Sequence, residues 1–472
     1  MSLKKRLLSI GIIGCLLAGV CMVAFARIQA NPVLEEPVAE EVAVYDTKET
    51  IYLWYSDSTM TDYLNSAAVA FGEGRDARVI PQLVSDSEYV EAINRASLEG
   101  PQIPDAYIIS NDSLSKAYLA GLATKVTNEA HCSVEHFPQT ALSAVTYKDR
   151  IIAYPFYYET SALLYNKTYL ETWTAEQLAN QGQGDLEEIP DDMPDAEIVE
   201  GEEDEEYIDS EQRLEVTLQQ IEAGIPTNMD ELLAFADNYD APENVEAILK
   251  WDVNDIFYNY YFVGEYMVVG GETGDDDGNI LIYSEEAKRC LEIFQSLNQF
   301  FAIDTETVDY DSILQEFIEG KLVFSVVTSD AVAVLEQAKA DGTFAYEYGI
   351  APMPQPSAEL EGRSLSVTNG VAINSYSEHQ ELANEFATFL TGEYQENLYD
   401  RTGKLAANKS VNADNEKLMS FMAEYEDSIS LPKMIETSNY WILLERAFSR
   451  IWTGTDVEME LQELMVQILS QF

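Results

Sequence analysis

Tyrosines surround a single carboxylate in the stretch YKDRIIAYPFYYETSALLYNKTYL, residues 147–170. Four of the five residues from Tyr154 to Tyr158 are aromatic, and Glu159 follows them directly. A purely apolar core strand does not favour this composition, because each buried phenol hydroxyl needs a hydrogen-bond partner. Flat rings beside a charged acceptor suit the wall of a ligand cleft, so Tyr157, Tyr158 and Glu159 are candidate ligand contacts, and about half of Tyr154–Tyr158 is expected to be packing.

Other polar side chains follow predicted strands. Ser56 and Asp57 come after the strand TIYLWY, and Asn111 and Asp112 come after the strand DAYIIS. In α/β sheets, ligands bind beyond the carboxyl ends of the strands. These four residues are therefore further candidate ligand contacts.

Strands and helices alternate in the first part of the chain. We expect strands at 50–55, 77–84 and 105–110, and helices at 62–71, 85–100 and 111–121. The second helix has Ser85 and Glu88 at the spacing of a capping box. This alternation predicts a mainly parallel sheet with helices on both faces.

Length and charge limit the function. The chain has 472 residues, enough for two lobes with separate cores. It carries 27 Lys and Arg against 84 Asp and Glu, a net charge of -57. Such a field repels phosphate backbones, so no nucleic-acid partner is expected.

The N-terminus has the pattern of an export signal. Lys4, Lys5 and Arg6 precede an apolar run that ends at Ala26. We predict a signal peptide or membrane anchor at 1–30 and a polar tether at 31–48. Cys15 leaves lipid anchoring open as a third hypothesis. Each of these predicts an exported protein, at the extracellular face of the membrane or in the periplasm, with the leader or anchor as its contact with the membrane.

A strongly acidic segment covers residues 181–212. From Asp185 to Glu211 it holds fifteen acidic residues and no Lys or Arg. A block of like charge with few large apolar residues cannot bury enough surface to fold, which predicts a disordered insertion. Calcium binding stays an alternative, although the spaced calcium-loop pattern is absent. No spaced zinc site or disulfide framework is present either, and no cofactor or metal is predicted.

The order of motifs resembles the family 1 extracellular solute-binding proteins of the maltose-binding-protein type. The segment AYPFYYETSALLYNK is similar to that family's first crossing between lobes, with its pattern A-Y-P…E…L-x-Y-N-K. FIEGKLVFSVVTS, GIAPMPQP, TNGVAINSYSEHQELANEFATFLTG and SNYWILLERAF are similar to later family segments. Only the leader, the tether and the acidic segment lie outside the resemblance.

The resemblance implies a periplasmic-binding-protein-like fold of type II: two α/β lobes joined by a hinge, with the ligand cleft between them. It places the first lobe at 49–158 plus 373–427 and the second at 159–372 plus 428–472, with the acidic segment inserted in the second. It also implies a non-enzymatic, monomeric carbohydrate-binding protein that delivers its ligand to the permease subunits of an ABC importer.

Several site residues are implied by family position alone. Glu159 and Asp112 take the places of cleft carboxylates, Ser56 that of a polar contact and Trp441 that of a stacking aromatic. Asn369, on the return crossing, and Asp330 complete the set. Asp330 and Ile109 stand where maltodextrin binders carry tryptophans, and Ser113 replaces a basic residue, which argues against a long maltodextrin as the ligand.

Two alternatives stay open. A sensor or adhesion module could keep the same lobes and answer to a signalling partner. A glycoside hydrolase needs two carboxylates at a defined separation, and an acidic chain offers such pairs by chance. No catalytic motif supports the hydrolase, so binding without catalysis is the preferred hypothesis.

Overall fold

The structure is a computed structural model that describes residues 48–85, 88–100, 102–184, 224–301, 303–411, 415–437 and 439–472. The predicted leader, the tether up to residue 47 and residues 185–212 of the acidic segment lie outside the described residues, whereas 181–184 form the end of a helix. Residues Glu49–Phe472 form one unit, to which everything below refers.

Three parallel strands begin the fold. Strand β1 (Glu49–Tyr55) pairs with β2 (Ala77–Leu83) on one side and β3 (Ala106–Ser110) on the other. The accompanying helices are α2 (Thr61–Gly72), α3 (Tyr89–Glu99) and α4 (Leu114–Leu119). The alternation predicted from the sequence is confirmed here. Helix α3 begins at Tyr89 without a side-chain cap, so the predicted capped start at Ser85 is wrong.

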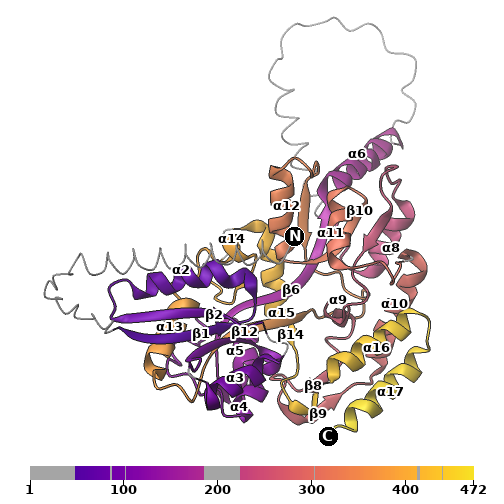
Figure 1. Ribbon diagram of the computed structural model, residues 1–472. Helices are drawn as coiled ribbons and strands as arrows, with labels where there is room; N and C mark the ends of the chain where they lie inside the picture. The colour runs from indigo at the N-terminus through magenta and orange to yellow at the C-terminus, as the bar shows by residue number, and fades with distance from the viewer. Residues whose placement is uncertain are drawn as a thin grey trace, which may run out of the picture. The chain divides into compact units, whose positions relative to one another are not determined.

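One long strand, β6 (Tyr154–Asn166), joins the two halves of a ten-stranded sheet (Figure 1). Residues 154–160 of β6 pair with β12 (Leu365–Ile373), whereas residues 161–165 pair with β10 (Leu322–Thr328). Both pairings are antiparallel, as is that of β12 with β3. The sheet is therefore mixed and not mainly parallel, because β6 and β12 run against their neighbours.

The main sheet order is β2-β1-β3-β12-β6-β10-β7, with β7 at Ala247–Lys250. Three short strands pair beside this path: β11 (Tyr348–Ala351) and β13 (Leu405–Ala406) on β6, and β14 (Ile429–Ser430) on β12. Two separate two-stranded ribbons are formed by β4 (Thr146–Tyr147) with β5 (Arg150–Ile151), and by β8 (Val268–Gly270) with β9 (Asp276–Leu281).

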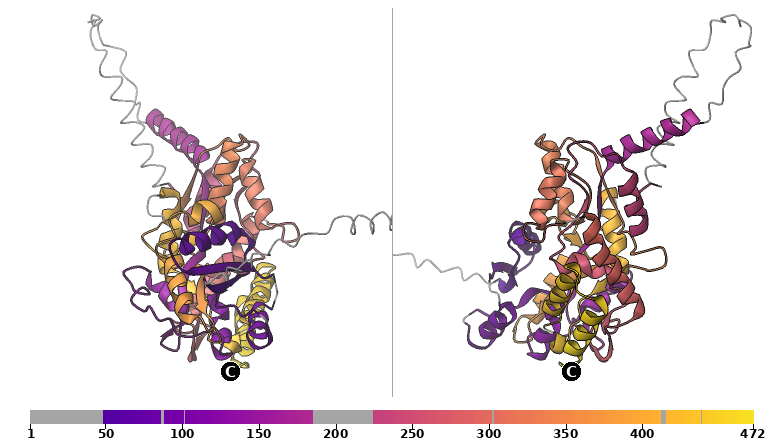
Figure 2. Two further views of the ribbon diagram at one scale, coloured as in Figure 1. Left: turned by 60° about the vertical axis from the view of Figure 1, so that its left-hand side comes forward. Right: turned by 90° about the vertical axis from the view of Figure 1, so that its right-hand side faces the viewer.

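The remaining helices cover the sheet or pack at its ends. They are α5 (Gln139–Val145), α6 (Lys167–Gly184), α8 (Met229–Asn238), α9 (Ile256–Asn259), α10 (Glu285–Phe301), α11 (Tyr310–Ile318), α12 (Asp330–Ala340), α13 (Gln380–Thr391), α14 (Leu398–Thr402), α15 (Met419–Asp427), α16 (Tyr440–Trp452) and α17 (Val457–Leu469). Figure 2 shows α16 and α17 lying side by side, while α6 projects away from the sheet. No described helix is long and apolar enough to cross a bilayer.

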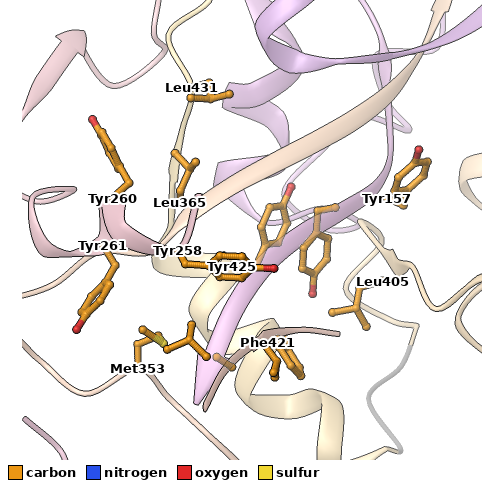
Figure 3. Packing of buried hydrophobic residues seen from close by; sticks show 14 of the residues in the cluster. Tyr157, Tyr258, Tyr260, Tyr261, Met353, Leu365, Leu405, Phe421, Tyr425 and Leu431 are labelled. Atoms are coloured by element: carbon orange, nitrogen blue, oxygen red, sulfur yellow. The ribbon is translucent and has the colours of Figure 1, made fainter. Parts of the chain in front are cut away.

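The crossing strand is packed on both edges and both faces. The four aromatic residues between Tyr154 and Tyr158 each expose at most 4% of their surface. The ring of Tyr158 stacks on Tyr425 of α15, with centroids 3.5 Å apart and planes 4° apart. Figure 3 shows Tyr425 and Phe421 of α15 in this cluster, with Leu405 of β13 nearby. The expectation that half of this run faces an open cleft is wrong, because β12 and β13 flank it and α15 covers it.

Candidate ligand-binding site

A charged cluster forms where β1 ends beside the crossing strand. The Lys404 ammonium lies 3.4 Å from Asp57 Oδ2 and forms an ion pair with Glu159. Asp57 lies two residues after β1, at the N-cap of the short 3-10 helix Ser58–Met60, Glu159 lies on β6, and Lys404 precedes β13. Ser56, next to Asp57, is exposed. Two predicted carboxylates are thus brought together by a lysine that the sequence did not single out.

The backbone before Lys404 is held in a fixed turn. Gly403 has φ +70°, in the left-handed region that glycine adopts without strain. Its N–H donates to the carbonyl of Tyr399 at 2.7 Å, and its own carbonyl accepts from Ser329 Oγ at 3.0 Å. After Lys404, Leu405 pairs with Tyr158. The lysine is therefore presented from a segment anchored on both sides.

The surroundings favour the charged forms of Asp57 and Lys404. Burial tends to raise the pKa of Asp57, but hydrogen bonds from Thr59 and the charge of Lys404 outweigh burial and lower it. Burial likewise opposes the charge on Lys404, and Glu159 and Asp57 raise the pKa of this ammonium above its ordinary value. The cluster thus presents charged acceptors and a charged donor at neutral pH.

A row of side chains on one face of the sheet leads away from the cluster. Glu159 lies directly opposite Val367, and Tyr157 opposite Asn369, in the pairing of β6 with β12. Asn369 also lies opposite Ser110 in the pairing of β12 with β3. Directly opposed residues project to the same face, so these side chains form a continuous row.

The row ends at a pocket. Ser110 Oγ donates to the carboxylate of Asp112, which lines a cavity of about 390 Å³. Trp441, at the start of α16, lines the same cavity and is partly buried. The other lining residues are Ser113, Ser115, Lys116, Leu431, Pro432, Met434, Thr437 and Tyr440.

Hydrogen bonds hold the walls of this pocket in place, one between Tyr260 and Tyr440 and two made by Asn111. The side chains of the neighbouring Tyr260 and Tyr261 point to opposite sides of their segment (Figure 3). The Tyr260 hydroxyl lies 3.1 Å from the hydroxyl of Tyr440, the residue before Trp441. Buried Asn111 accepts from the Thr368 N–H at 2.9 Å and donates to the Leu431 carbonyl at 3.4 Å. Asn111 thus links the end of β3 to the pocket wall.

The other predicted residues take different positions. Asp330, the first residue of α12, packs against Gly403, and its carboxylate accepts from the hydroxyls of Tyr310 and Thr328. Tyr157 is buried beneath Lys404, whose Nζ lies 5.9 Å from the ring centroid. Burial, followed by the nearby Asp57 and Glu159, raises the pKa of Tyr157. Tyr158 packs on Tyr425, away from the charged cluster.

Some buried donors near these strands have no hydrogen-bond partner within the described ranges. They are Trp54 Nε1 on β1 and the hydroxyls of Tyr89 and Tyr107. Trp54 and Tyr107 lie opposite each other in the pairing of β1 with β3. Buried polar groups without a partner are uncommon in folded proteins. Within the described residues, no group of three or more His, Cys, Asp or Glu side chains is arranged to hold a metal.

Three solved structures with the same fold are distant from this chain in sequence. The extracellular solute-binding protein of Staphylococcus aureus in complex with maltose matches with a TM-score of 0.68 at 17% identity, covering 89% of this chain and 97% of that one. A cyclo/maltodextrin-binding protein complexed with maltotetraose gives 0.67 at 18% identity, covering 90% and 97%. The maltose-binding periplasmic protein of Listeria monocytogenes in complex with maltose gives 0.65 at 17%, covering 90% and 99%.

These likenesses confirm the predicted periplasmic-binding-protein-like fold, with two α/β lobes that share the mixed sheet. The lobe boundaries stay a prediction. A search of curated proteins found no significant match. The model of the bacterial extracellular solute-binding protein family matches residues 66–426, most of the chain. The chain therefore belongs to the bacterial extracellular solute-binding proteins.

Proposed function

We propose that the protein binds a neutral mono- or oligosaccharide between its lobes and delivers it, unaltered, to the permease subunits of an ABC importer. The observation that carries this proposal is the row of side chains that joins the cluster around Lys404 to the pocket with Asp112 and Trp441. One surface thus combines charged acceptors, a charged donor and a flat aromatic ring.

Each part of this surface suits a different part of a sugar. The carboxylates of Asp57, Glu159 and Asp112 accept hydrogen bonds from hydroxyls, while the Lys404 ammonium donates to hydroxyl oxygens. The Trp441 indole offers an apolar face for the C–H side of a sugar ring. Asn369, on the row between them, has both a donor and an acceptor.

The remaining predicted contacts take secondary roles in this proposal. Ser56 is exposed beside Asp57 and can meet a ligand from the rim. Tyr157 forms the floor beneath Lys404, and Asp330 lies beside the Gly403 turn. Tyr158 and Asn111 support the site through packing and backbone hydrogen bonds.

The class of ligand also has support from the neighbours, whose structures hold maltose or maltotetraose. Ile109 and Asp330 still argue against a long maltodextrin. Ile109 exposes only 3% of its surface, and Asp330 offers a carboxylate where a stacking ring would be needed. A short sugar fits the 390 Å³ pocket better.

A thermal-shift screen against neutral mono- and oligosaccharides tests the proposal. A sugar at a hundred times its dissociation constant stabilises the folded state by about 2.7 kcal/mol, which raises the melting temperature measurably. The sugar is then recovered and analysed. Turnover would replace binding with hydrolysis, and the absence of any shift across the screen would reject a carbohydrate ligand.

Delivery needs a separate measurement. If a permease is encoded beside this gene, that permease, reconstituted in proteoliposomes, should hydrolyse ATP faster when the sugar-loaded protein is added. A neighbouring histidine kinase that responds to the loaded protein, with no effect on any permease, would favour a sensor instead.

A further inference from the structure

The Asp57 and Glu159 carboxylates share one cation. Within the described part of the chain, Lys404 is the only Lys, Arg or His that pairs with either of them. We infer that Lys404 is the specificity-determining residue that makes this site select uncharged sugars over cationic ones such as amino sugars. This inference rests on the proposed function, because it concerns the ligand of the same site.

The fold, and not the lysine, brings Asp57 and Glu159 close to one another. Asp57 accepts from the Thr59 N–H at 2.9 Å and from the Thr59 hydroxyl at 2.7 Å, which fixes it at the end of β1. Glu159 is held on the central strand by pairing with β12. Removing the ammonium therefore leaves two like charges facing one space, and such an arrangement attracts a cation.

The position that the Lys404 ammonium occupies would also suit another cation. The Lys404 side chain is 19% exposed, so it is largely shielded from bulk solvent but keeps some accessible surface. The ring of Tyr157 lies 5.9 Å from Lys404 Nζ and offers a cation–π contact in addition to the carboxylates. A protonated amine on a ligand could occupy the same position with the same partners if Lys404 did not fill it.

Lys404 also changes what the site offers to a neutral sugar. Carboxylates accept hydrogen bonds and cannot donate them, whereas an ammonium donates three. A sugar hydroxyl both donates and accepts, so it can be satisfied between Glu159 and Lys404. Without the lysine, a neutral sugar finds only hydrogen-bond acceptors at this position. Its binding would also remove water from two carboxylates whose negative charge has no counterion, which costs free energy.

The substitution Lys404→Met can be made without dismantling the turn. The Gly403 carbonyl bond to Ser329 and the pairing of Leu405 with Tyr158 involve backbone groups, and these remain. Lys409→Met is the matched control. It removes the same charge from the same segment, but the Lys409 ammonium is exposed and donates to the Val134 carbonyl, away from both carboxylates.

The experiment compares two disaccharides with the same skeleton, N,N′-diacetylchitobiose and its deacetylated form, by calorimetry at about pH 6, where the free amines are protonated. In Lys404→Met, the affinity ratio of the cationic over the neutral disaccharide should rise at least about tenfold relative to the unsubstituted protein. Lys409→Met and the charge-conserving Lys404→Arg should keep the original ratio.

An unchanged ratio in folded Lys404→Met would overturn the inference, as would the same rise in Lys409→Met. Lys404→Gln provides a second variant if the methionine protein does not fold. If the unsubstituted protein binds no neutral sugar in the thermal-shift screen, the proposed function is rejected. A gain of cation binding in Lys404→Met would still support the role of Lys404 in excluding cations.

Discussion

Asp112 and Trp441 line one pocket, although Asp112 follows strand β3 and Trp441 lies in the first turn of helix α16, more than 300 residues later in the sequence. The carboxylate is exposed and the indole is partly buried, so the pocket has one wet and one apolar wall. The Asn111 side chain joins these walls through the Leu431 carbonyl. The pocket thus brings together residues that lie far apart in the sequence.

Trp441→Ala should weaken sugar binding by about 2 kcal/mol or more, because it removes the flat wall of the pocket. The free energy of unfolding should fall less in Trp441→Ala than in Trp452→Ala, which serves as a control. Trp452 is 2% exposed and packs on Phe294, so its truncation should cost about 3–5 kcal/mol. Urea unfolding and calorimetry on both variants check this. A Trp441→Ala protein with full affinity would remove the indole from the site.

Glu159→Gln should lower the affinity for the sugar by about 1.5–3 kcal/mol, the usual range for a hydrogen bond to a charged group. Stability should change little, because the Glu159 side chain is 35% exposed and its ion pair with Lys404 is partly solvated. Glu171→Gln is the control, since Glu171 pairs with Lys167 on α6, away from the cluster. Equal affinities of the two variants would show that the site lies elsewhere.

The alternating first part of the fold could be predicted because each element there is a local pattern. Strands at 50–55, 77–84 and 105–110 match β1, β2 and β3 to within a residue or so at each end. The mixed sheet could not be predicted in the same way. The pairing of β6 with β12 and β10 joins residues far apart in the chain, and only the family resemblance pointed to a crossing strand.

The candidate site was only partly predictable for the same reason. Asp57 and Asp112 follow strands, which is a local signal. Lys404 was missed because nothing around TGKLAAN marks it, and its partners come from β6 and from the turn after β1. For the tyrosines the error was the reverse, since Tyr158 was predicted to contact the ligand but lies in the core. Their hydroxyls suggested a wet wall, yet Tyr158 meets Tyr425 in the core and exposes 2% of its surface.

Tyr425→Ala should destabilise the protein by about 3–5 kcal/mol, because the ring packs on Tyr158 and is itself 1% exposed. Tyr425→Phe keeps the stack and loses the hydrogen bond to Thr368 Oγ1, which is 2.7 Å long. Its cost should be about 1–3 kcal/mol, since a buried polar atom loses its partner. Urea unfolding measures both. Equal costs would mean that the stacked ring contributes little to holding α15 on the crossing strand.

Lys433 connects the pocket wall to helix α5. It lies between the lining residues Pro432 and Met434, but its side chain is fully buried and donates to the carbonyls of Ser143 and Thr146 at the end of α5. Burial lowers the pKa of this ammonium to about 7, against the opposing charge of Asp275. A neutral amine keeps two N–H donors, so the contact with the carbonyls survives deprotonation.

The low pKa makes the contribution of Lys433 to stability depend on pH. The folded value of about 7 lies below the ordinary value of 10.5, so the unfolded chain binds more protons between these two values. Stability contributed by this group therefore rises with pH across that window and is lowest below pH 7. The free energy of unfolding of the unsubstituted protein minus that of Lys433→Met should increase from about pH 7 to about pH 9. Lys409→Met, which removes an exposed lysine, should show no such trend. Urea titrations across this range measure the difference, and a flat profile would mean that the carbonyls of α5 keep the Lys433 ammonium charged throughout.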